Sequence, residues 1–393
     1  MIVARRPVFD RALDLTAYEL LAAPAQGEEL TAADVADAVS RLLLEVATEA
    51  DIAAILGEQP AWLRLSVPAA QQAVAAGLAR PSATIELRPN GSAPEQIRDA
   101  VAGLRAHGHT VAVEVPGDHD AAAELVQGAD IAAVDVGSMA GSAITAAAER
   151  LKPAVGSLAA SGVDTPQSHE AAREAGFDLF RGEFFKKPRS TGGDLAPSRL
   201  AVLRLLGSLQ DPAVELSDLA KLLSQDVSLT YRLLRYINSA FFGMRREVTS
   251  IPHALALLGL RNVKRWATVM MLADVDHRPR ELLTTALVRA RFCELVGPHF
   301  KQSNSDQLFT LGLFSVLDAL MDTQMARALR PLPLGEEMVG ALTLRTGAHG
   351  KVLDCALAAE RGEHCRGVPV DGGEIADLYR QCMEWGTESA REL

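Results

Sequence analysis

Short apolar stretches alternate with Ala-rich amphipathic stretches through the first 188 residues of the chain. The apolar stretches are rich in β-branched residues and predict strands at residues 17–21, 61–67, 83–88, 110–115, 130–136, 153–159 and 178–185. The amphipathic stretches predict helices, including those at residues 31–50, 93–108 and 165–177. Strand and helix in alternation predict parallel βαβ units. So many units in so short a segment favour a closed (β/α) barrel of the TIM type, with an open doubly wound sheet as the alternative.

The pattern changes after residues 189–198, a segment that contains Pro, Gly and Ser, and only helical spacing follows. One predicted helix begins at Asp226, ends at Gly243 and has an apolar stripe formed by Leu229, Leu233, Ile237 and Phe241. Further helices are predicted at residues 250–272, 280–300, 306–321, 335–344 and 349–363. The fold class is therefore α/β followed by all-α, with a barrel at 1–188, a linker at 189–198 and a helical domain at 199–393.

The composition is that of an ordinary globular protein, with 48% hydrophobic and 23% charged residues. No stretch approaches the ~20 apolar residues of a membrane span, and the first residues lack the apolar run of a signal peptide. We therefore expect a cytoplasmic protein. The four cysteines have no C-x-x-C spacing, which predicts reduced, mostly buried thiols rather than a zinc site or disulfides at Cys293, Cys355, Cys365 and Cys382.

The net charge of −11 is carried mainly by the first half of the chain. An acidic balance argues against broad nucleic-acid binding, because neutralising phosphates requires a basic face. One short segment carries Arg261, Lys264 and Arg265 and could be taken for a DNA-reading helix. Its neighbours Val263 and Trp266 are typical of core positions, so we expect the basic side chains to lie on the solvent side of an amphipathic helix.

Four segments carry a resemblance to known families. RRPVFDRALDLTAYELL (5–21) and SGVDTPQSHEAAREAGFDLFRGEFFKKP (161–188) resemble an EAL domain, the barrel of cyclic di-GMP phosphodiesterases. LSQDVSLTYRLLRYINSAFFG (223–243) and TSIPHALALLGLRNVKRW (249–266) resemble an HDOD domain. The order of the two resembles the EAL-HDOD family, and the resemblance covers nearly the whole chain.

The resemblance implies a site at the mouth of the barrel. Active EAL enzymes hold divalent metal there through a Glu, an Asn, a second Glu and an Asp-Asp pair on successive strands, and a Lys completes the catalytic set. Such oxygen ligands suit magnesium, which activates water for attack on a phosphodiester. The resemblance places Glu19 and Glu86 on the two Glu positions.

The other positions depart from the family pattern. Arg64 stands at the Asn position, Glu114-Val115 at the Asp pair and Ala133 at the Lys position, with Asp135 two residues further on. The remaining departures are Ala23 for an Arg, Arg181 for a Gln and Asp164 for a Glu.

Whether these departures still allow metal binding depends on where the side chain of Arg64 points. At ~5 Å from a divalent ion and an effective dielectric of about 20, its repulsion would be roughly 6 to 7 kcal/mol, enough to empty a magnesium site. We hypothesise that its guanidinium lies between Glu19 and Glu86 and replaces the cation. Two alternatives are open. Arg64 points elsewhere and Glu19, Glu86, Glu114 and Asp135 hold an ion, or these residues are merely solvated strand ends.

The helical half shows a parallel loss. Catalytic HD phosphohydrolases hold metal through a His-Asp pair in a helix, and the resembling stretch here, residues 312–320, has none, as is characteristic of HDOD domains. The one His-Asp dipeptide of the chain, His119-Asp120, lies in a polar loop and is interpreted as the cap of a helix.

The sequence thus predicts a signalling protein without hydrolytic activity or cofactor, which acts by contact with a signalling protein that the sequence does not name. The apolar segments 255–260 and 311–317 are candidate docking surfaces, with burial in the core as the alternative. A second hypothesis is a receptor that holds cyclic di-GMP without cleaving it, using Arg64 and Arg181 to attract phosphate. A third is a magnesium-dependent phosphodiesterase.

Overall fold

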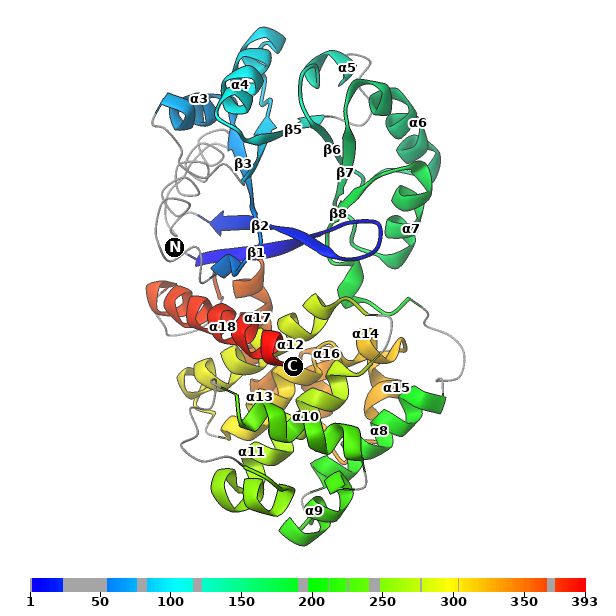
Figure 1. Ribbon diagram of the computed structural model, residues 1–393, viewed down its shortest axis with the longest axis vertical. Coiled ribbons are helices and arrows are strands. Elements are labelled where there is room, and N and C mark those ends of the chain that lie inside the picture. The colour runs from blue at the N-terminus through cyan, green and yellow to red at the C-terminus, as the bar shows by residue number, and fades with distance from the viewer. Residues whose placement is uncertain are drawn as a thin grey trace. The chain divides into compact units, whose positions relative to one another are not determined.

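The computed structural model describes residues 2–23, 55–75, 83–115, 122–189, 197–211, 213–224, 226–239, 248–275, 278–302, 304–365 and 372–393. The predicted helix at 31–50 and the dipeptide His119-Asp120 lie outside these ranges. The chain divides into two compact units, whose main segments are Met1–Phe185 and Lys186–Leu357 (Figure 1).

The first unit is a closed barrel in which each strand pairs with the next and the last pairs with the first. The predicted barrel is therefore confirmed. Its strands are β1 (Ile2–Phe9), β2 (Leu15–Ala23), β3 (Ala61–Ser66), β4 (Thr84–Arg88), β5 (Thr110–Val115), β6 (Ile131–Asp135), β7 (Ser157–Ser161) and β8 (Leu179–Arg181).

Strand β1 was not expected from the sequence, because Arg5, Arg6 and Pro7 interrupt its apolar pattern. It pairs antiparallel with both β2 and β8, whereas the remaining neighbours are parallel. The turn to β2 is held by Asp10, whose Oδ1 accepts hydrogen bonds from the N–H groups of Ala12 and Asp14. The barrel thus opens with a hairpin rather than with a βαβ unit.

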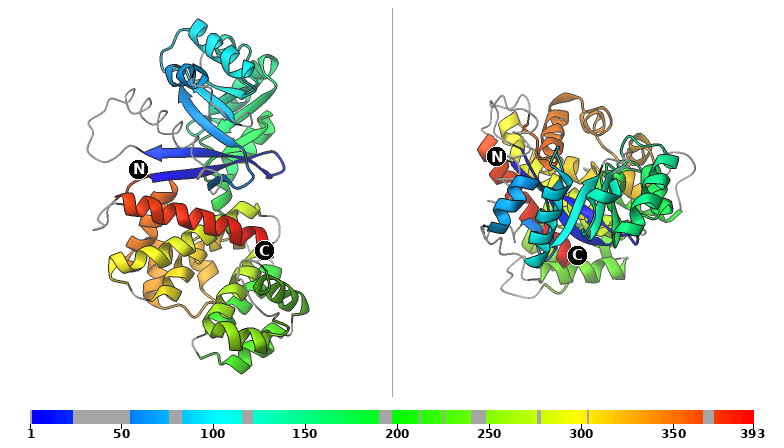
Figure 2. Two further views of the ribbon diagram at one scale, coloured as in Figure 1. Left: turned by 60° about the vertical axis from the view of Figure 1, so that its left-hand side comes forward. Right: turned by 90° about the horizontal axis from the view of Figure 1, so that it is seen from above.

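Helices cover the outside of the parallel strands, as both sets of views show (Figures 1 and 2). They are α3 (Val67–Ala75), α4 (Pro94–Ala106), α5 (Ala122–Leu125), α6 (Gly141–Leu151) and α7 (Pro166–Ala175), with 3₁₀ turns η1 (Lys152–Ala154) and η2 (Phe184–Lys186). The predicted helices at 93–108 and 165–177 are confirmed as α4 and α7.

Two predicted strands were wrong at one end. The segment 153–159 begins in η1, and its strand starts only at Ser157, beyond Gly156. The segment 178–185 is extended only as far as Arg181, because Gly182 has a φ of 154° and the chain then turns into η2. A positive φ favours Gly strongly, so the strand cannot continue through this position with an ordinary side chain.

Small side chains and one large ring fill the barrel. Alternation along each strand turns every second residue inward. The inward residues include Trp62, which packs against side chains that are small or β-branched. These are Val8, Ala17, Ala112, Ile131, Ala133 and Ala159. The bottom of the barrel is therefore a packed core rather than a pore.

The second unit is helical over the residues that the structure describes, and the predicted all-α class is confirmed. Its helices begin with α8 (Pro197–Gln210), α9 (Leu216–Ser224), α10 (Val227–Ile237), α11 (Ile251–Ala273), α12 (Arg280–Val296), the 3₁₀ turn η4 (Gly297–Phe300) and α13 (Ser305–Phe314). Further along the chain lie α14 (Leu317–Met321), α15 (Met325–Leu329), α16 (Glu336–Leu344), α17 (Gly347–Glu360) and α18 (Gly372–Glu392). The division assigns Ala358–His364 and Asp371–Arg380, and with them the end of α17 and the first part of α18, to the first unit. No helix of the described ranges combines the length and apolar character that crossing a membrane requires.

Helix α10 confirms its predicted cap and part of its predicted stripe. The side chain of Asp226 accepts a hydrogen bond from the N–H of Leu229, and Leu229, Leu233 and Ile237 are buried. Phe241 and Gly243 lie outside the described residues, and the helix itself ends at Ile237.

The basic segment of α11 is only partly solvated, which corrects the expectation for Arg265. Its side chain is 16% exposed, contacts Glu294 and Asp306, and lies over the ring of Phe309 at 4.0 Å. Arg261, by contrast, is 78% exposed. A guanidinium held by two carboxylates and an aromatic ring is not free to read DNA, so Arg265 has a structural role.

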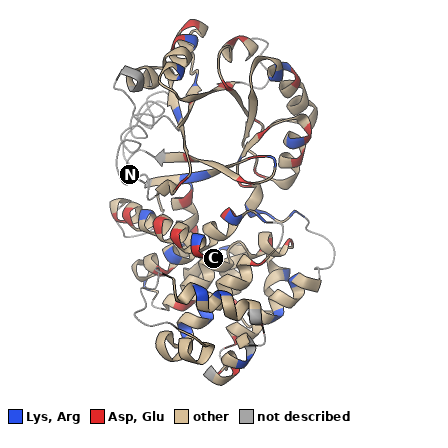
Figure 3. Ribbon diagram, viewed as in Figure 1, with Lys and Arg blue, Asp and Glu red and all other residues tan. Residues whose placement is uncertain are grey.

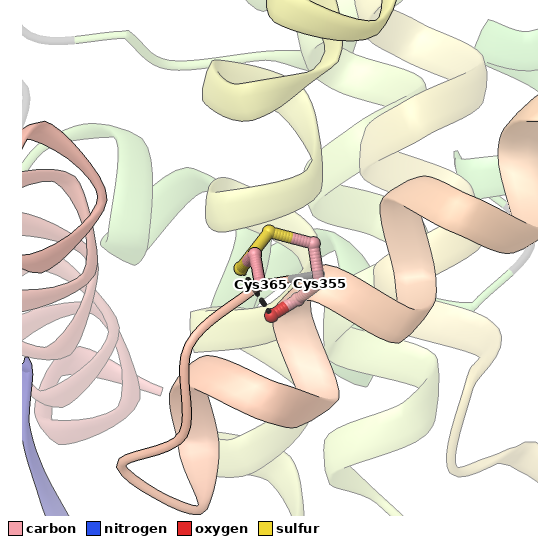
Figure 4. The surroundings of a disulfide bond; sticks show 2 residues. All are labelled: Cys355 and Cys365. Carbon is pink, nitrogen blue, oxygen red and sulfur yellow. Dashed lines mark hydrogen bonds between the residues drawn. A yellow bond between two sulfur atoms is a disulfide. The ribbon is translucent and has the colours of Figure 1, made fainter. Parts of the chain in front are cut away.

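The prediction of four reduced thiols was wrong for one pair. Cys355 and Cys365 form a disulfide, because the chain turns back after α17 and brings their Cα atoms within 4.8 Å (Figure 4). Spacing along the sequence did not show this turn. Cys293 and Cys382 are free and buried, and burial raises the pKa of each thiol to about 12.

Gly182 offers a test of how tightly the end of β8 is fixed. A Cβ at this position would lie 2.0 Å from the carbonyl oxygen of Val163, which already accepts the N–H of Phe184. We expect Gly182→Ala to lower the free energy of unfolding of the barrel by about 1 to 3 kcal/mol. The matched control is Gly141→Ala in α6, where a Cβ meets nothing within 4 Å.

Hydrogen exchange of barrel peptides during urea titration measures this effect separately from the helical unit. Equal protection in the Gly182→Ala and Gly141→Ala variants would show that the close approach to Val163 does not constrain the strand.

Candidate functional site

Charged side chains meet inside the barrel because strand alternation turns them inward. Four charged residues each lie two positions after an interior residue: Glu19 after Ala17, Arg64 after Trp62, Glu114 after Ala112 and Arg181 after Leu179. Residues two apart on a strand share a face. Register adds Glu86 of β4, which pairs with Arg64 of β3 and with Ala112 of β5.

Arg64 is the centre of this cluster. Its Nε lies 3.1 Å from Glu86 Oε1, and its Nη2 lies 2.8 Å from Glu114 Oε1. Its Nη1 is 3.8 Å from Glu19 Oε1. The geometry that the sequence predicted for Arg64, between Glu19 and Glu86, is therefore present, and Glu114 is a third partner.

Arg181 supplies a second guanidinium, which is more deeply buried than that of Arg64. It is 1% exposed, and its Nη1 lies 2.7 Å from Glu86 Oε2 and 3.4 Å from Glu19 Oε1. Its guanidinium also lies over the ring of Trp62 at 4.7 Å, and the indole Nε1 donates to Glu86 Oε2 at 2.6 Å. Both oxygens of Glu86 are thus occupied by positively polarised donors.

Two further arginines border the cluster. Arg6 of β1 stands opposite Glu19 in the register, and its Nη1 lies 3.3 Å from Glu19 Oε2. Arg88 of β4 lies 3.2 Å from Glu114 Oε2. Neither had been singled out from the sequence. Arg6 could have been found only by recognising β1, since the hairpin places it opposite Glu19.

The electrostatics favour the charged forms of Glu86 and Arg64. Burial alone would raise the pKa of Glu86, but Arg181 and Arg64 hold it below its usual value. Burial would likewise lower the pKa of Arg64, but Glu86, Glu19 and Glu114 raise it above its usual value. Each group is charged because its neighbours carry the opposite charge.

Two predicted site residues are not brought into the network. Asp135 follows the inward pattern of β6, but it is exposed, and its Oδ1 accepts from the N–H of Gly137. Asp164 is exposed in the loop after β7, where its Oδ1 accepts from the N–H of Glu183. Both stabilise loops through backbone hydrogen bonds.

The magnesium that the EAL resemblance implies does not fit these residues. Its ligands would be the oxygens of Glu19, Glu86 and Glu114, and guanidinium groups already contact all three carboxylates. Within the described part of the chain, no three His, Cys, Asp or Glu side chains are arranged to hold a metal ion. A divalent metal ion at this place would have to displace guanidinium groups, which are side chains of the barrel itself.

The helical unit has a buried polar cluster that includes the stretch 312–320. Arg289 of α12 is buried and donates to Ser315 Oγ at 3.1 Å, and Ser315 Oγ donates to the carbonyl of Gly312 at 2.7 Å. Burial raises the pKa of Asp318, although Arg289 opposes the shift. A Cβ at Gly312 would lie 2.3 Å from the carbonyl oxygen of Arg289, so α12 and α13 leave no room at this point.

Removal of the Arg64 guanidinium tests the charge balance of the barrel. Arg64→Met removes one of the cations that contact Glu86 and Glu114, and we expect a loss of about 1 to 3 kcal/mol in the free energy of unfolding at neutral pH. Glu86 has a lowered pKa in the folded barrel, so its stabilising effect is present above its usual pKa of 4.5 and is lost as the pH falls through the folded value. The difference between wild type and variant should therefore shrink under acid conditions.

Urea unfolding of both proteins from pH 7 down to pH 3 measures this difference. The control is Arg173→Met, which removes an exposed pair with Glu170 and should leave stability essentially unchanged. A difference that stayed constant over the whole pH range would mean that Arg64 contributes through packing rather than through charge.

Comparison with known proteins adds the following. Residues 196–329 match the HDOD domain family. The chain is 30% identical over 239 residues to the cyclic di-GMP phosphodiesterase CdgJ of Vibrio cholerae. This match covers 58% of this chain and 55% of that protein. It is 27% identical over 232 residues to the protein YuxH of Bacillus subtilis, covering 57% of each. The match thus spans little more than half the length of these relatives.

A solved structure, BlrP1 of Klebsiella pneumoniae with calcium and cyclic di-GMP, is 19% identical, with a TM-score of 0.38 over 46% of this chain and 54% of that one. The family match to the helical unit and the observed topology of the first unit bear out the sequence prediction. The chain has the architecture of the EAL-HDOD proteins that it resembles, with a closed eight-stranded barrel followed by an HDOD domain at residues 196–329.

Proposed function

We propose that this protein takes part in cyclic di-GMP-related signalling without hydrolysing the nucleotide, and that it acts by contact with another protein. The observation that carries the proposal is the contact of guanidinium groups with the carboxylates that resemble metal ligands. Arg64 and Arg181 lie 3.1 and 2.7 Å from the two oxygens of Glu86, the carboxylate that resembles a metal ligand of the phosphodiesterases.

A metal-dependent reaction has two requirements that this site does not meet. A divalent ion must lower the pKa of a water molecule, and a general base must accept its proton. The carboxylates of this site face guanidinium groups, which contact the oxygens that would hold a metal or accept a proton, and Arg181 and Arg64 hold the pKa of Glu86 below its usual value. The Lys position of active relatives is Ala133, which is buried and carries no titratable group.

Contact with a protein partner is supported by the apolar surface of α11. Of the two segments predicted as docking surfaces, residues 311–317 are entirely buried and belong to the core. In the other, residues 255–260, Leu257 is 50% exposed while Leu255 is buried. Gly259 interrupts the helix at this point with a φ of 79°, which turns the segment away from regular helical packing.

A second candidate function is a receptor that binds cyclic di-GMP without cleaving it. The charge of the cluster favours it, since four arginines surround three carboxylates and leave one positive charge in excess. Arg6, Arg64 and Arg88 have side chains that are 30%, 27% and 36% exposed, so water and phosphate can reach them. A phosphodiester anion is the ligand class that such an excess attracts.

Calorimetric titration of the full chain with cyclic di-GMP, with and without Mg²⁺ or Mn²⁺, separates these functions when the nucleotide is afterwards analysed for linear product. We expect no product under any condition, because guanidinium groups contact the three carboxylates that would otherwise hold the added metal. Metal-dependent product in the wild type, absent from a Glu86→Gln variant, would overturn the proposal.

The heat of the same titration distinguishes the first candidate from the second. Saturable heat without product would assign receptor function to the barrel. In that case Arg88→Gln should weaken binding about tenfold, as expected for loss of one charge-assisted hydrogen bond, and Arg98→Gln on the outer helix α4 should not. No heat at all would leave partner contact as the function.

A further inference from the structure

The helical unit contains a cavity that the barrel chemistry does not involve. It has a volume of about 170 Å³ and lies between the end of α11 and the start of α12. Arg232, Arg278 and Arg280 line it together with Asp274, and apolar residues such as Leu283 and Leu320 complete the wall. Three arginines around so small a space point to an anionic occupant.

Among the residues that line this cavity, Arg278 has a buried donor without an acceptor. Its side chain is only 4% exposed, and its Nε has no hydrogen-bond partner. Its Nη2 lies 2.8 Å from Asp322 Oδ1. A buried guanidinium N–H without an acceptor is costly, because the group has lost its hydration.

The acidic side chains near Arg278 do not fully balance its positive charge. Among the described residues Asp322 is its carboxylate partner, and Arg199 also contacts that carboxylate, at 3.3 Å. The backbone N–H of Arg189 donates to Asp322 as well. Burial lowers the pKa of Arg278 to about 10, and the positive charges of Arg189 and Arg199 contribute to the shift. The carboxylate of Asp322 is therefore shared by the guanidinium groups of Arg278 and Arg199.

The acidic residue of the cavity wall does not remove this excess. Asp274 forms a bidentate ion pair with Arg232, so these two charges neutralise each other. Arg280 is exposed at the rim, and its charge is available to a ligand. Among the described side chains that line the cavity, the charges of Arg278 and Arg280 therefore remain.

The start of α12 adds to the positive potential. This helix has 17 residues, begins at Arg280, and has no side-chain cap at Pro279. The N–H groups of a first turn and the helix dipole both attract anions. Glu281 is acidic and lies in the first turn, but it does not line the cavity.

We propose that this cavity binds the phosphate group of a small molecule, either inorganic phosphate or the terminal phosphate of a monoester. Phosphate fits better than a carboxylate, because it carries close to two negative charges at neutral pH and offers oxygens to several donors at once. The volume is below that of pockets that enclose whole drug-sized ligands, so only the anionic group enters. The site is independent of the proposed function of the barrel.

Titration calorimetry of the full chain with inorganic phosphate, at constant ionic strength set with sodium chloride, tests the proposal. A parallel titration with glycerol 3-phosphate distinguishes the sources, since a monoester that binds as tightly as phosphate identifies the terminal group of a larger molecule. We expect saturable 1:1 binding of phosphate.

Arg280→Gln is the main variant, because its exposed side chain can be changed without disturbing the core, and it should weaken binding about tenfold. Arg278→Lys keeps the charge but removes Nε, and should weaken binding similarly; circular dichroism checks that it folds. The matched controls are Arg261→Gln, exposed on α11, and Arg88→Gln in the barrel.

The proposal is overturned if the wild type shows no saturable heat beyond that of chloride. It is also overturned if both cavity variants bind like the wild type, or if Arg88→Gln alone abolishes binding, which would place the phosphate in the barrel.

Discussion

The ion pairs between Arg64, Arg181 and Glu86 are the interaction on which the barrel depends. Glu86 is fully buried, and a buried carboxylate persists as an anion only when cations and hydrogen-bond donors surround it. Two guanidinium groups and the indole N–H of Trp62 meet this requirement. The strands that carry these donors must therefore hold a fixed register around Glu86.

The same constraint explains why the cluster extends over so many strands. Arg64 has more donors than Glu86 can accept, and it reaches Glu114, which in turn contacts Arg88. Glu19 receives Arg181 from β8 and Arg6 from β1, so the network closes across the first and last strands of the barrel. Charge pairing and barrel closure thus support each other, whereas a metal site would have drawn the same carboxylates together by coordination.

The helical unit follows a comparable rule with different residues. Acidic and basic positions are interspersed along its ribbon, and most of the buried or half-buried arginines described above meet a carboxylate or a hydroxyl (Figure 3). Within the described residues Arg278 differs, because it shares the carboxylate of Asp322 with Arg199 and keeps an N–H without an acceptor. That imbalance, rather than any motif, distinguishes the cavity beside it.

The sequence by itself predicted the barrel, with an open sheet as the alternative, the helical unit and a place for Arg64 between Glu19 and Glu86, because alternation, helical spacing and family motifs are properties of short segments. It did not determine β1, since an Arg-Arg-Pro run becomes a strand only when the rest of the barrel supplies its partners. The disulfide at Cys355, the burial of Arg265 and the separation of Asp135 and Asp164 from the network were likewise decided by tertiary structure. Each depends on where a turn places one side chain relative to a distant one, and local periodicity carries no information about that distance.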